Sequence, residues 1–215
     1  MKKTFLFSAL LLTALLAQIS EAASGSISKA GDEPTDTIMG KSIPMPVLEA
    51  YHNGEIKKID MRTYKDKWIV LFFYPADFTF VCPTELKELS DYYADFTSGG
   101  AEILSISTDS AYVHRAWHRE NALLKNVKFP MLSDRSGAFS RALGVYESSK
   151  GTSIRAAFIV DPDGKIVAAE YTSDSIGRNA GELLRKLDAA IAVRKGGGGF
   201  CPAGWVEGSE LIHGE

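Results

Sequence analysis

The stretch PADFTFVCPTE, Pro75 to Glu85, follows directly on WIVLFFY, Trp68 to Tyr74. The earlier run is apolar throughout and of strand length, which is typical of a strand buried on both faces of a sheet. Beyond Cys82 apolar residues recur at every third or fourth position, which predicts an amphipathic helix that ends at Gly99 and Gly100. These residues are Leu86, Leu89, Tyr93 and Phe96. Cys82 therefore stands where a buried strand gives way to a helix.

The start of this helix suits a reactive thiol. Pro83 is favoured in a first helical turn, and Glu85 suits the positive end of the helix dipole. Unpaired backbone N–H groups at a helix start, like nearby cations, favour the thiolate, which is the reactive form of cysteine. Thr79, just before Cys82, offers a hydroxyl that can donate to the thiolate or to an oxygen of a bound substrate. The stretch itself lacks a cation.

The elements on either side of this stretch predict an α/β fold. Asn53-Gly54 suits a type I′ turn between two extended segments, and DPDG, residues 161–164, predicts a turn between two strands. Strands and helices alternate before a final hairpin and helix, which favours a sheet with helices on both faces. We predict strands at 102–107, 157–160 and 165–171, helices at 111–124 and 179–195, and a loop through KFPMLSD, residues 128–134.

The first residues read as an export signal. Lys2 and Lys3 precede an apolar stretch from Phe5 to Leu16, which indicates a secretory signal peptide over residues 1–22, cleaved after Ala22. The apolar stretch is shorter than the roughly 20 residues that a membrane-spanning helix needs. We therefore expect a bacterial protein that is periplasmic or secreted, without stable membrane association after cleavage.

The rest of the chain divides into three parts. Residues 23–40 are small, polar and aperiodic and predict a flexible lead-in. Residues 41–195 carry the strand and helix patterns and form the folded domain. Residues 196–215 begin with four glycines, which predict a flexible tail that carries Cys201.

Charge and cysteine content narrow the function classes. The formal net charge of −3 indicates neither a nucleic-acid-binding surface nor a strongly basic site for acidic ligands. Cys82 and Cys201 are the two cysteines, far apart, with no C-x-x-C pair and no metal-type cluster. In an oxidising compartment they could form a structural disulfide, two inert thiols or a working redox pair. Composition leaves all of these open.

PADFTFVCPTE resembles the P-x-x-x-T-x-x-C motif of the peroxiredoxins, which are thiol peroxidases. Further blocks, in the same order from about Ile43 to Gly208, are similar to the typical 2-Cys class and most of all to its bacterial alkyl hydroperoxide reductase C type. The resemblance implies an α/β, thioredoxin-like fold with a mixed central sheet flanked by helices on both faces. The blocks are STDSAYVHRAWH (107–118), RAAFIVDPDGKI (155–166), SIGRNAGELLRKL (175–187) and CPAGWVEG (201–208).

The resemblance also implies a role for each matching residue. Cys82 would be the peroxidatic cysteine, which attacks hydrogen peroxide or an organic hydroperoxide and becomes a sulfenic acid. Pro75 would shield Cys82, and Thr79 would hydrogen-bond the peroxide. Arg155 would be the missing cation. No metal or organic cofactor would be needed.

Three further residues complete the implied machinery. Glu85 and Arg178 would orient the cation. Cys201 would be the resolving cysteine, which acts on the partner subunit of a homodimer, and an external dithiol protein of the thioredoxin type would reduce the disulfide. Because a disulfide needs closely spaced Cα atoms, the first turn of the Cys82 helix and the tail must unfold locally for the thiols to meet. The resemblance also implies a decamer, with Phe78 and Phe80 at subunit contacts.

The chain departs from easily overoxidised relatives in two places. It lacks a G-G-L-G insertion, since YESSKGTS precedes Arg155, and it lacks a Y-F helix after Cys201. We therefore expect resistance to sulfinic acid formation. His114 and His118 have a spacing that can bind zinc, but without a third ligand we expect packing or surface roles. The alternative functions are an exported thiol–disulfide oxidoreductase and a chaperone-like oligomer with a structural disulfide.

Overall fold

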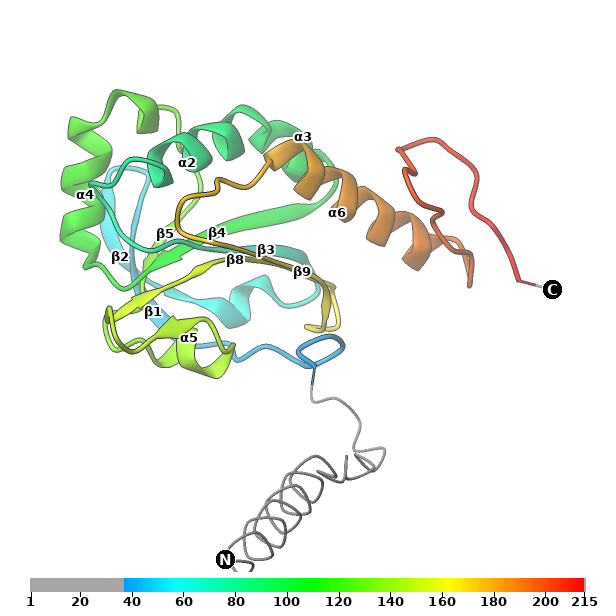
Figure 1. Ribbon diagram of the computed structural model, residues 1–215, viewed down its shortest axis with the longest axis horizontal. Coiled ribbons are helices and arrows are strands. Elements are labelled where there is room, and N and C mark those ends of the chain that lie inside the picture. The colour runs from blue at the N-terminus through cyan, green and yellow to red at the C-terminus, as the bar shows by residue number, and fades with distance from the viewer. Residues whose placement is uncertain (1–36, 215) are drawn as a thin grey trace, which may run out of the picture. The chain divides into compact units, whose positions relative to one another are not determined.

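A computed structural model describes residues 37–214. The predicted signal peptide and nearly all of the lead-in lie outside the described residues. The described chain builds a seven-stranded sheet in the order β2-β1-β5-β4-β3-β8-β9 and a two-stranded sheet of β6 and β7 (Figure 1). The large-sheet strands are β1 (Val47–His52), β2 (Glu55–Asp60), β3 (Trp68–Phe73), β4 (Ala101–Ser107), β5 (Met131–Ser133), β8 (Arg155–Val160) and β9 (Ile166–Thr172), and the small ones are β6 (Tyr146–Glu147) and β7 (Thr152–Ser153).

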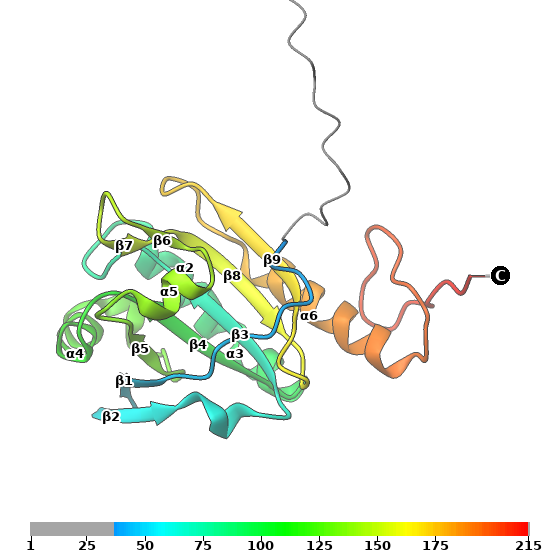
Figure 2. The same ribbon diagram turned by 90° about the horizontal axis from the view of Figure 1, so that it is seen from below.

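Helices cover both faces of the large sheet, as the sequence predicts. On one face α2, α3, α4 and α6 pack over the sheet, and on the other lie α5 and the short 3-10 helix η1 (Figures 1 and 2). The helices are α2 (Cys82–Asp91), α3 (Tyr93–Ser98), α4 (Ala111–Glu120), α5 (Ala138–Ala142) and α6 (Ala180–Lys195), with 3-10 helices η1 (Met61–Tyr64) and η2 (Ala122–Leu124).

Strand β3 is the centre of the molecule. It runs parallel to β4 and antiparallel to β8, and all of its residues are buried. Val70 and Phe72 enter the core under α2 and α6, whereas Leu71 and Phe73 enter the core on the α5 side. The continuous apolar run is thus explained by burial on both faces.

Both predicted turns are present. Asn53 and Gly54 have φ angles of 51° and 86°, the left-handed pair that a type I′ turn needs, and His52 pairs with Glu55 across it. In the second turn the N–H of Gly164 donates to the carbonyl of Asp161.

Three predicted boundaries were wrong. The helix after Cys82 is two helices, because Tyr92 (φ −92°, ψ 4°) interrupts it. The predicted loop 128–134 contains β5, a three-residue strand between β1 and β4 whose partners are distant in sequence. The helix from Ala111 ends at Glu120 and is followed by η2. Sequence reasoning also missed α5, β6 and β7, which are too short to show a period.

Specific contacts join the tail to α6 and join parts of the tail to one another. Trp205 is 4% exposed, and its carbonyl accepts a hydrogen bond of 2.9 Å from Nη1 of Arg185. Its indole N–H donates to the carbonyl of Ser209, and Phe200 pairs with Ile212 in an isolated bridge. Among the helices of residues 37–214, none combines the length and the apolar character needed to cross a membrane.

Candidate active site

The candidate site begins where β3 ends. The chain leaves β3 at Phe73 and passes through residues 75–81, here called the active-site loop, before α2 starts with Cys82. Cys82 is the first residue of α2 and is fully buried, with Pro83 behind it in the first turn. Within the loop Phe78 has a φ of 55°, a left-handed conformation that costs a non-glycine residue about 1 kcal/mol or more. The surrounding contacts must therefore hold the loop in this form.

Arg155 is the cation that the local stretch lacks. It is the first residue of β8, and the antiparallel pairing of Phe73 with Ala156 brings it to the end of β3. Its Nη1 lies 3.3 Å from Sγ of Cys82 and 2.6 Å from Oε2 of Glu85, and its Nε donates to the carbonyl of Asp174 at 3.0 Å. The guanidinium is therefore fixed on both sides.

Arg178 holds the other side of the Glu85 carboxylate. Its N–H and its Nε both lie 2.9 Å from Oε1 of Glu85, and its Nη2 lies 3.1 Å from Oε2. Its Nη1 donates to the carbonyl of Ala156, and its guanidinium stacks 3.4 Å from the centroid of the Phe72 ring. Burial lowers the pKa of Arg178, and the hydrogen bond to Glu85 opposes this shift.

The charges of this group do not cancel. The two guanidinium groups and one carboxylate, all with side chains at most 4% exposed, leave one net positive charge. That charge lies against Sγ of Cys82 and complements a thiolate there. The arrangement is suited to an anionic nucleophile and to charge that develops next to it.

Thr79 and Pro75 lie on the active-site loop but do not contact Cys82 by a hydrogen bond. The Thr79 hydroxyl donates to the carbonyl of Ala76 at 2.9 Å, so its proton faces the loop and its lone pairs stay open. Pro75 is half-buried at the start of the loop. Their predicted roles toward a peroxide and as a shield stay predictions.

Cys201 lies outside this site, on the tail. It is half-buried, and its thiol contacts the carbonyl of Ala189 on α6 at 3.5 Å. Both Cys82 and Cys201 are free thiols in the chain. The structure thus brings Cys82, Glu85, Arg155 and Arg178 together and leaves the second cysteine apart.

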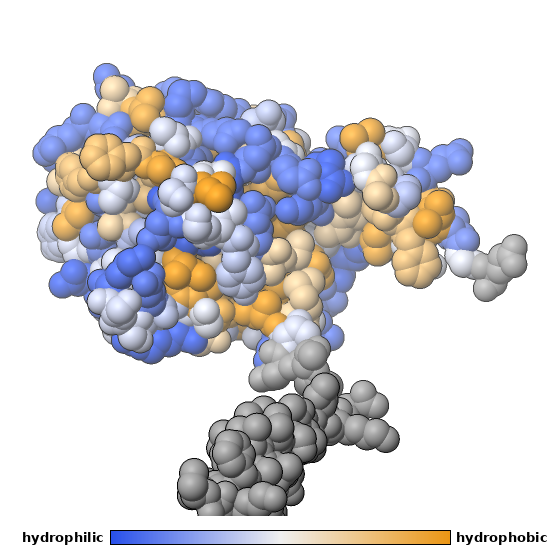
Figure 3. Space-filling view, in the orientation of Figure 1, coloured by the Kyte–Doolittle hydropathy of each residue, from blue (hydrophilic) through white to orange (hydrophobic). Residues whose placement is uncertain are grey.

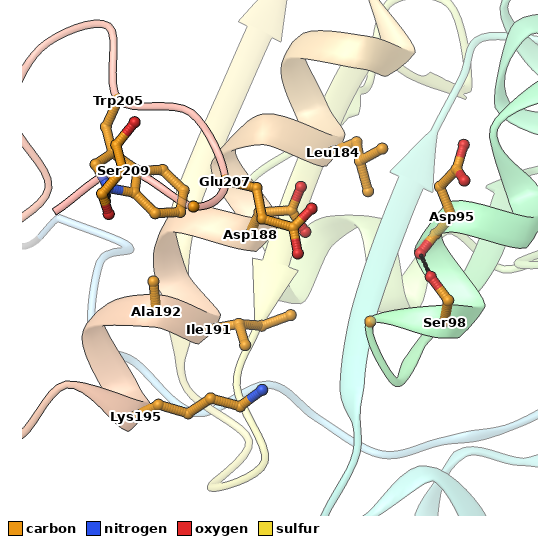
Figure 4. A pocket seen from close by; sticks show the side chains of 12 residues that line it. Asp95, Ser98, Leu184, Asp188, Ile191, Ala192, Lys195, Trp205, Glu207 and Ser209 are labelled. Atoms are coloured by element: carbon orange, nitrogen blue, oxygen red, sulfur yellow. Dashed lines mark hydrogen bonds between the residues drawn. The ribbon is translucent and has the colours of Figure 1, made fainter.

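A pocket of about 500 Å³ lies between the tail, α6 and α3. The side chains of Asp188 on α6 and Glu207 on the tail lie close together there, and Asp95 on α3 lines the other side of the pocket (Figure 4). Burial raises the pKa of Asp188, and the negative charges of Glu207 and Asp95 raise it further. The contact between tail and α6 therefore contains a mutual repulsion.

Sequence reasoning missed a buried polar cluster beside the loop, formed by Tyr74, Asp77 and His114. His114 has the packing role that was predicted for it, since it is fully buried. His118 contacts the Tyr51 hydroxyl and is part-buried. Within the described part of the chain no group of histidine, cysteine and acidic residues is placed to hold a metal.

Comparisons with known proteins agree on one group of relatives. The model of the AhpC/TSA family matches residues 39–169. Alkyl hydroperoxide reductase C of Salmonella typhimurium and that of Escherichia coli (strain K12) are each 42% identical over 164 residues, which is 76% of this chain and 88% of each relative. The Staphylococcus epidermidis protein of the same name is 40% identical over 178 residues, which is 82% of this chain and 94% of that relative.

Two solved structures are similar over most of the described chain. The crystal structure of Enterococcus faecalis AhpC aligns with a TM-score of 0.75 and 40% identity, and covers 77% of this chain and 99% of that one. Reduced Plasmodium vivax 2-Cys peroxiredoxin aligns with a TM-score of 0.77 and 32% identity, and covers 81% of this chain and 92% of that one.

Proposed function

This chain belongs to the AhpC/TSA family and is a thiol-dependent peroxidase of the peroxiredoxin type, and we propose that Cys82 is the thiol that reduces its hydroperoxide substrate. The thioredoxin-like fold expected from the sequence is confirmed. The relatives favour a peroxidase over the thiol–disulfide oxidoreductase and the chaperone-like oligomer. The observation that carries the assignment of Cys82 is its burial at the start of α2, 3.3 Å from a guanidinium that Glu85 holds in place.

The first step is a displacement at oxygen. The Cys82 thiolate attacks one oxygen of the hydroperoxide, an S–O bond forms and the O–O bond breaks. The departing oxygen takes a proton and leaves as water or an alcohol, and Cys82 becomes a sulfenic acid. The Arg155 guanidinium is the group we assign to the developing negative charge on the peroxide oxygens. The Thr79 hydroxyl donates its proton to Ala76, so we assign it to accept a hydrogen bond from the O–H of the hydroperoxide.

Preorganisation is the reason why we expect this site to react fast. Arg155 is fixed by Glu85 and by the carbonyl of Asp174, and Arg178 fixes Glu85 from the other side. The cation therefore needs little reorganisation when charge develops at the reacting oxygens. Pro75, at the start of the loop, would limit the approach of water.

The second step uses Cys201 of the partner subunit. Its thiol attacks the sulfur of the Cys82 sulfenic acid, a disulfide forms and water leaves. Because a disulfide requires Cα atoms within about 7 Å, the buried Cys82 and the tail must both leave the positions described above. The tail is suited to this movement, since Gly197 and Gly198 separate it from α6 and few bonds hold it. An external dithiol protein of the thioredoxin type would then reduce the disulfide.

We propose that the protein is exported from the cytoplasm, because residues 1–22 resemble a signal peptide. We also propose that it is an oligomer, because it has an exposed apolar surface. Phe78 and Phe80, both on the active-site loop, are 55% and 96% exposed. Apolar residues also gather over the end of the molecule where α2 and α4 lie, at the left of Figure 3. This surface supports contacts between dimers and hence a decamer. The stretch YESSKGTS, which stands before Arg155 in place of a G-G-L-G insertion, supports resistance to sulfinic acid formation.

The test is the reaction of the fully reduced protein with hydrogen peroxide in stopped flow. We expect Cys82 to react orders of magnitude faster than a free thiol at the same pH, and Cys82→Ser to abolish the reaction. Cys201→Ser is the matched variant: it keeps the first step and loses the intersubunit disulfide on a non-reducing gel. A rate no faster than that of a free thiol would refute the proposal.

A further inference from the structure

A short exposed segment holds the outer side of Arg155. It is the stretch 173–178 between β9 and α6, here called the strap. At one end of the strap the buried Arg178 is bonded to Glu85, whereas residues 173–177 are all exposed. Within this exposed part the carbonyl of Asp174 accepts the hydrogen bond of 3.0 Å from Nε of Arg155. The position of this carbonyl therefore affects the direction in which the Arg155 guanidinium points.

Thr172 on β9 lies beside Arg155 without bonding to it. The two residues are directly opposite each other in the pairing of β8 with β9, so both side chains project from the same face of the sheet. The Thr172 hydroxyl is nevertheless the one buried side-chain oxygen or nitrogen among residues 37–214 that has no hydrogen-bond partner. Nε of Arg155 is thus held by the strap and not by the neighbouring strand.

Lys150 anchors the strap from outside. Its Nζ lies 2.6 Å from Oδ2 of Asp174 and 2.9 Å from Oε2 of Glu147. The side chains of Lys150 and Asp174 are 51% and 46% exposed. Hydrogen bonds to Asp174 and then to Glu147 raise the pKa of Lys150, so its ammonium group stays charged throughout the neutral range. Asp174 therefore joins two cations, because its carbonyl binds Arg155 and its carboxylate binds Lys150.

Lys150 stands on a well-bonded support, the turn between β6 and β7. The backbone N–H groups of Lys150 and Gly151 donate to the carbonyl of Glu147 at 3.2 and 2.9 Å. The carbonyl of Gly151 accepts a hydrogen bond of 3.1 Å from the hydroxyl of Thr108, which directly follows β4. The β6–β7 hairpin and the strap lie at the same end of the large sheet (Figure 2). The hairpin thus connects the strap to the central strands.

We propose that Lys150 is a positioning residue that, through Asp174, keeps the guanidinium of Arg155 directed at Cys82 and thereby speeds the reaction with peroxide. This inference rests on the proposed function and deepens it by adding a residue that touches neither the thiol nor the peroxide. Without the ammonium group, the exposed part of the strap loses its anchor, and the Asp174 carbonyl moves more freely. Arg155 then spends less time in the orientation that the reaction needs.

The exposure of the ion pair determines the size and the salt dependence of the effect. Exposed ion pairs contribute little and are screened by salt, so loss of the Lys150 charge should slow the reaction by about two- to fivefold. The buried pair of Arg155 and Glu85 is screened much less. Hydrogen peroxide carries no charge, so its encounter with the thiolate does not itself depend on ionic strength. Salt therefore weakens the Lys150 contact while the buried part of the site stays intact.

The experiment measures the rate of the first reaction phase of the fully reduced protein with hydrogen peroxide in stopped flow. At low ionic strength Lys150→Met should react about two- to fivefold more slowly than the unchanged protein. Lys150→Arg keeps the charge and should restore most of the rate. At about 1 M salt, where the Debye length is about 3 Å, the rates with Lys150 and with Lys150→Met should converge. Equal rates at low ionic strength, or a difference that salt does not reduce, would overturn the proposal.

Lys87→Met is the matched control. Lys87, on α2, forms an ion pair of the same length, 2.6 Å, with Asp91, and its side chain is 49% exposed. Because this pair lies away from the strap, Lys87→Met should leave the rate unchanged at every ionic strength. Asp174→Asn removes the carboxylate charge but keeps the carbonyl, so it should slow the reaction as Lys150→Met does, and both changes together should cost no more than Lys150→Met alone. Costs that multiply would contradict the proposal, since the two side chains would then act separately.

A second measurement needs no peroxide. Exchange of the Nε–H of Arg155 with solvent can be followed by NMR spectroscopy, and the signal is assigned by its loss in Arg155→Lys. Lys150→Met should speed this exchange by about two- to fivefold, and Lys87→Met should not change it. If Cys82 proves unreactive toward peroxide, the exchange still reports on the contact, and the proposed function alone fails. Faster exchange with an unchanged peroxide rate, or a slower peroxide rate with unchanged exchange, would overturn the role of Lys150.

Discussion

The two cysteines are held in opposite ways. Cys82 is fully buried, lies at a helix start and contacts a guanidinium that is itself bonded to Glu85. Cys201 is half-buried on a tail, and its thiol lies 3.5 Å from the carbonyl of Ala189 on α6. The two thiols therefore have different structural requirements. The first needs a rigid polar environment, and the second needs freedom to leave its place.

The largest expected effect is at Glu85, the residue that makes the Cys82 environment rigid. Glu85→Gln removes the carboxylate from two buried arginines and should lower the free energy of unfolding by about 3–5 kcal/mol, as when one partner of a buried ion pair is lost. Urea unfolding measures this change. Glu88→Gln is the control, because a glutamine oxygen can still accept the exposed hydrogen bond of 3.4 Å that the Glu88 carboxylate receives from Asn179. If Glu85→Gln lowers the free energy of unfolding by less than about 1 kcal/mol, the Glu85 carboxylate is not essential for holding Arg155 and Arg178 in place.

A smaller effect is expected where the tail docks. Trp205→Ala removes the tail's buried side chain and should raise the alkylation rate of Cys201 by about tenfold or more, since a large buried ring is lost from a local contact. In the Cys82→Ser background only Cys201 reacts. The midpoint of global urea unfolding should hardly move, and exposed Val206→Ala should change neither quantity. A large loss of global stability would mean that the tail is part of the core after all.

The smallest effect concerns the carboxylates of the tail pocket. Burial raises the pKa of Asp188, and the negative charges of Glu207 and Asp95 raise it further. Of these two charges, that of Glu207 belongs to the docked tail. A raised pKa in the docked state means that the stabilisation is complete below the ordinary carboxyl range, near pH 4, and is lost as the pH rises through the pKa of the docked group. Asp188→Asn should therefore tighten docking at neutral pH by a few-fold at most and flatten its pH dependence.

The probe for this last change is a disulfide reagent that reacts with thiols in acid, such as dithiodipyridine, applied to Cys201 in the Cys82→Ser background. Slower reaction of Asp188→Asn at neutral pH, and equal rates in acid, is the expected pattern. Faster reaction at neutral pH would mean that the Asp188 carboxylate attracts the tail rather than repels it.

The features that depend on neighbouring residues alone, such as single strands, helix starts and tight turns, can be predicted from the sequence. The apolar run before Pro75 and the change of period after Cys82 place the thiol at a strand-to-helix junction, as the structure has it. Asn53 and Gly54 have the positive φ angles that their residue types favour. Three-residue β5 escapes such reasoning, because its partners on β1 and β4 lie far away in the chain.

The site itself depends on distant partners, which periodicity does not predict. Arg155 is 73 residues from Cys82, and Arg178 is 93 residues from Glu85. The family resemblance supplied both. It did not supply His114, 37 residues from Asp77, because an aspartate in a loop and a histidine on a helix give no sign that they meet.

The position of Arg155 at the first residue of β8 also bears on how the sheet assembles. The rest of that strand, AAFIV, is apolar and buried on both faces, so its pattern does not distinguish one pairing register with β3 from the next. A slip by one residue would turn the guanidinium to the other face of the sheet and leave Glu85 without one of its partners. Arg155 thus also specifies the register in which β8 pairs with β3. A chain with the wrong register would be inactive as well as unstable.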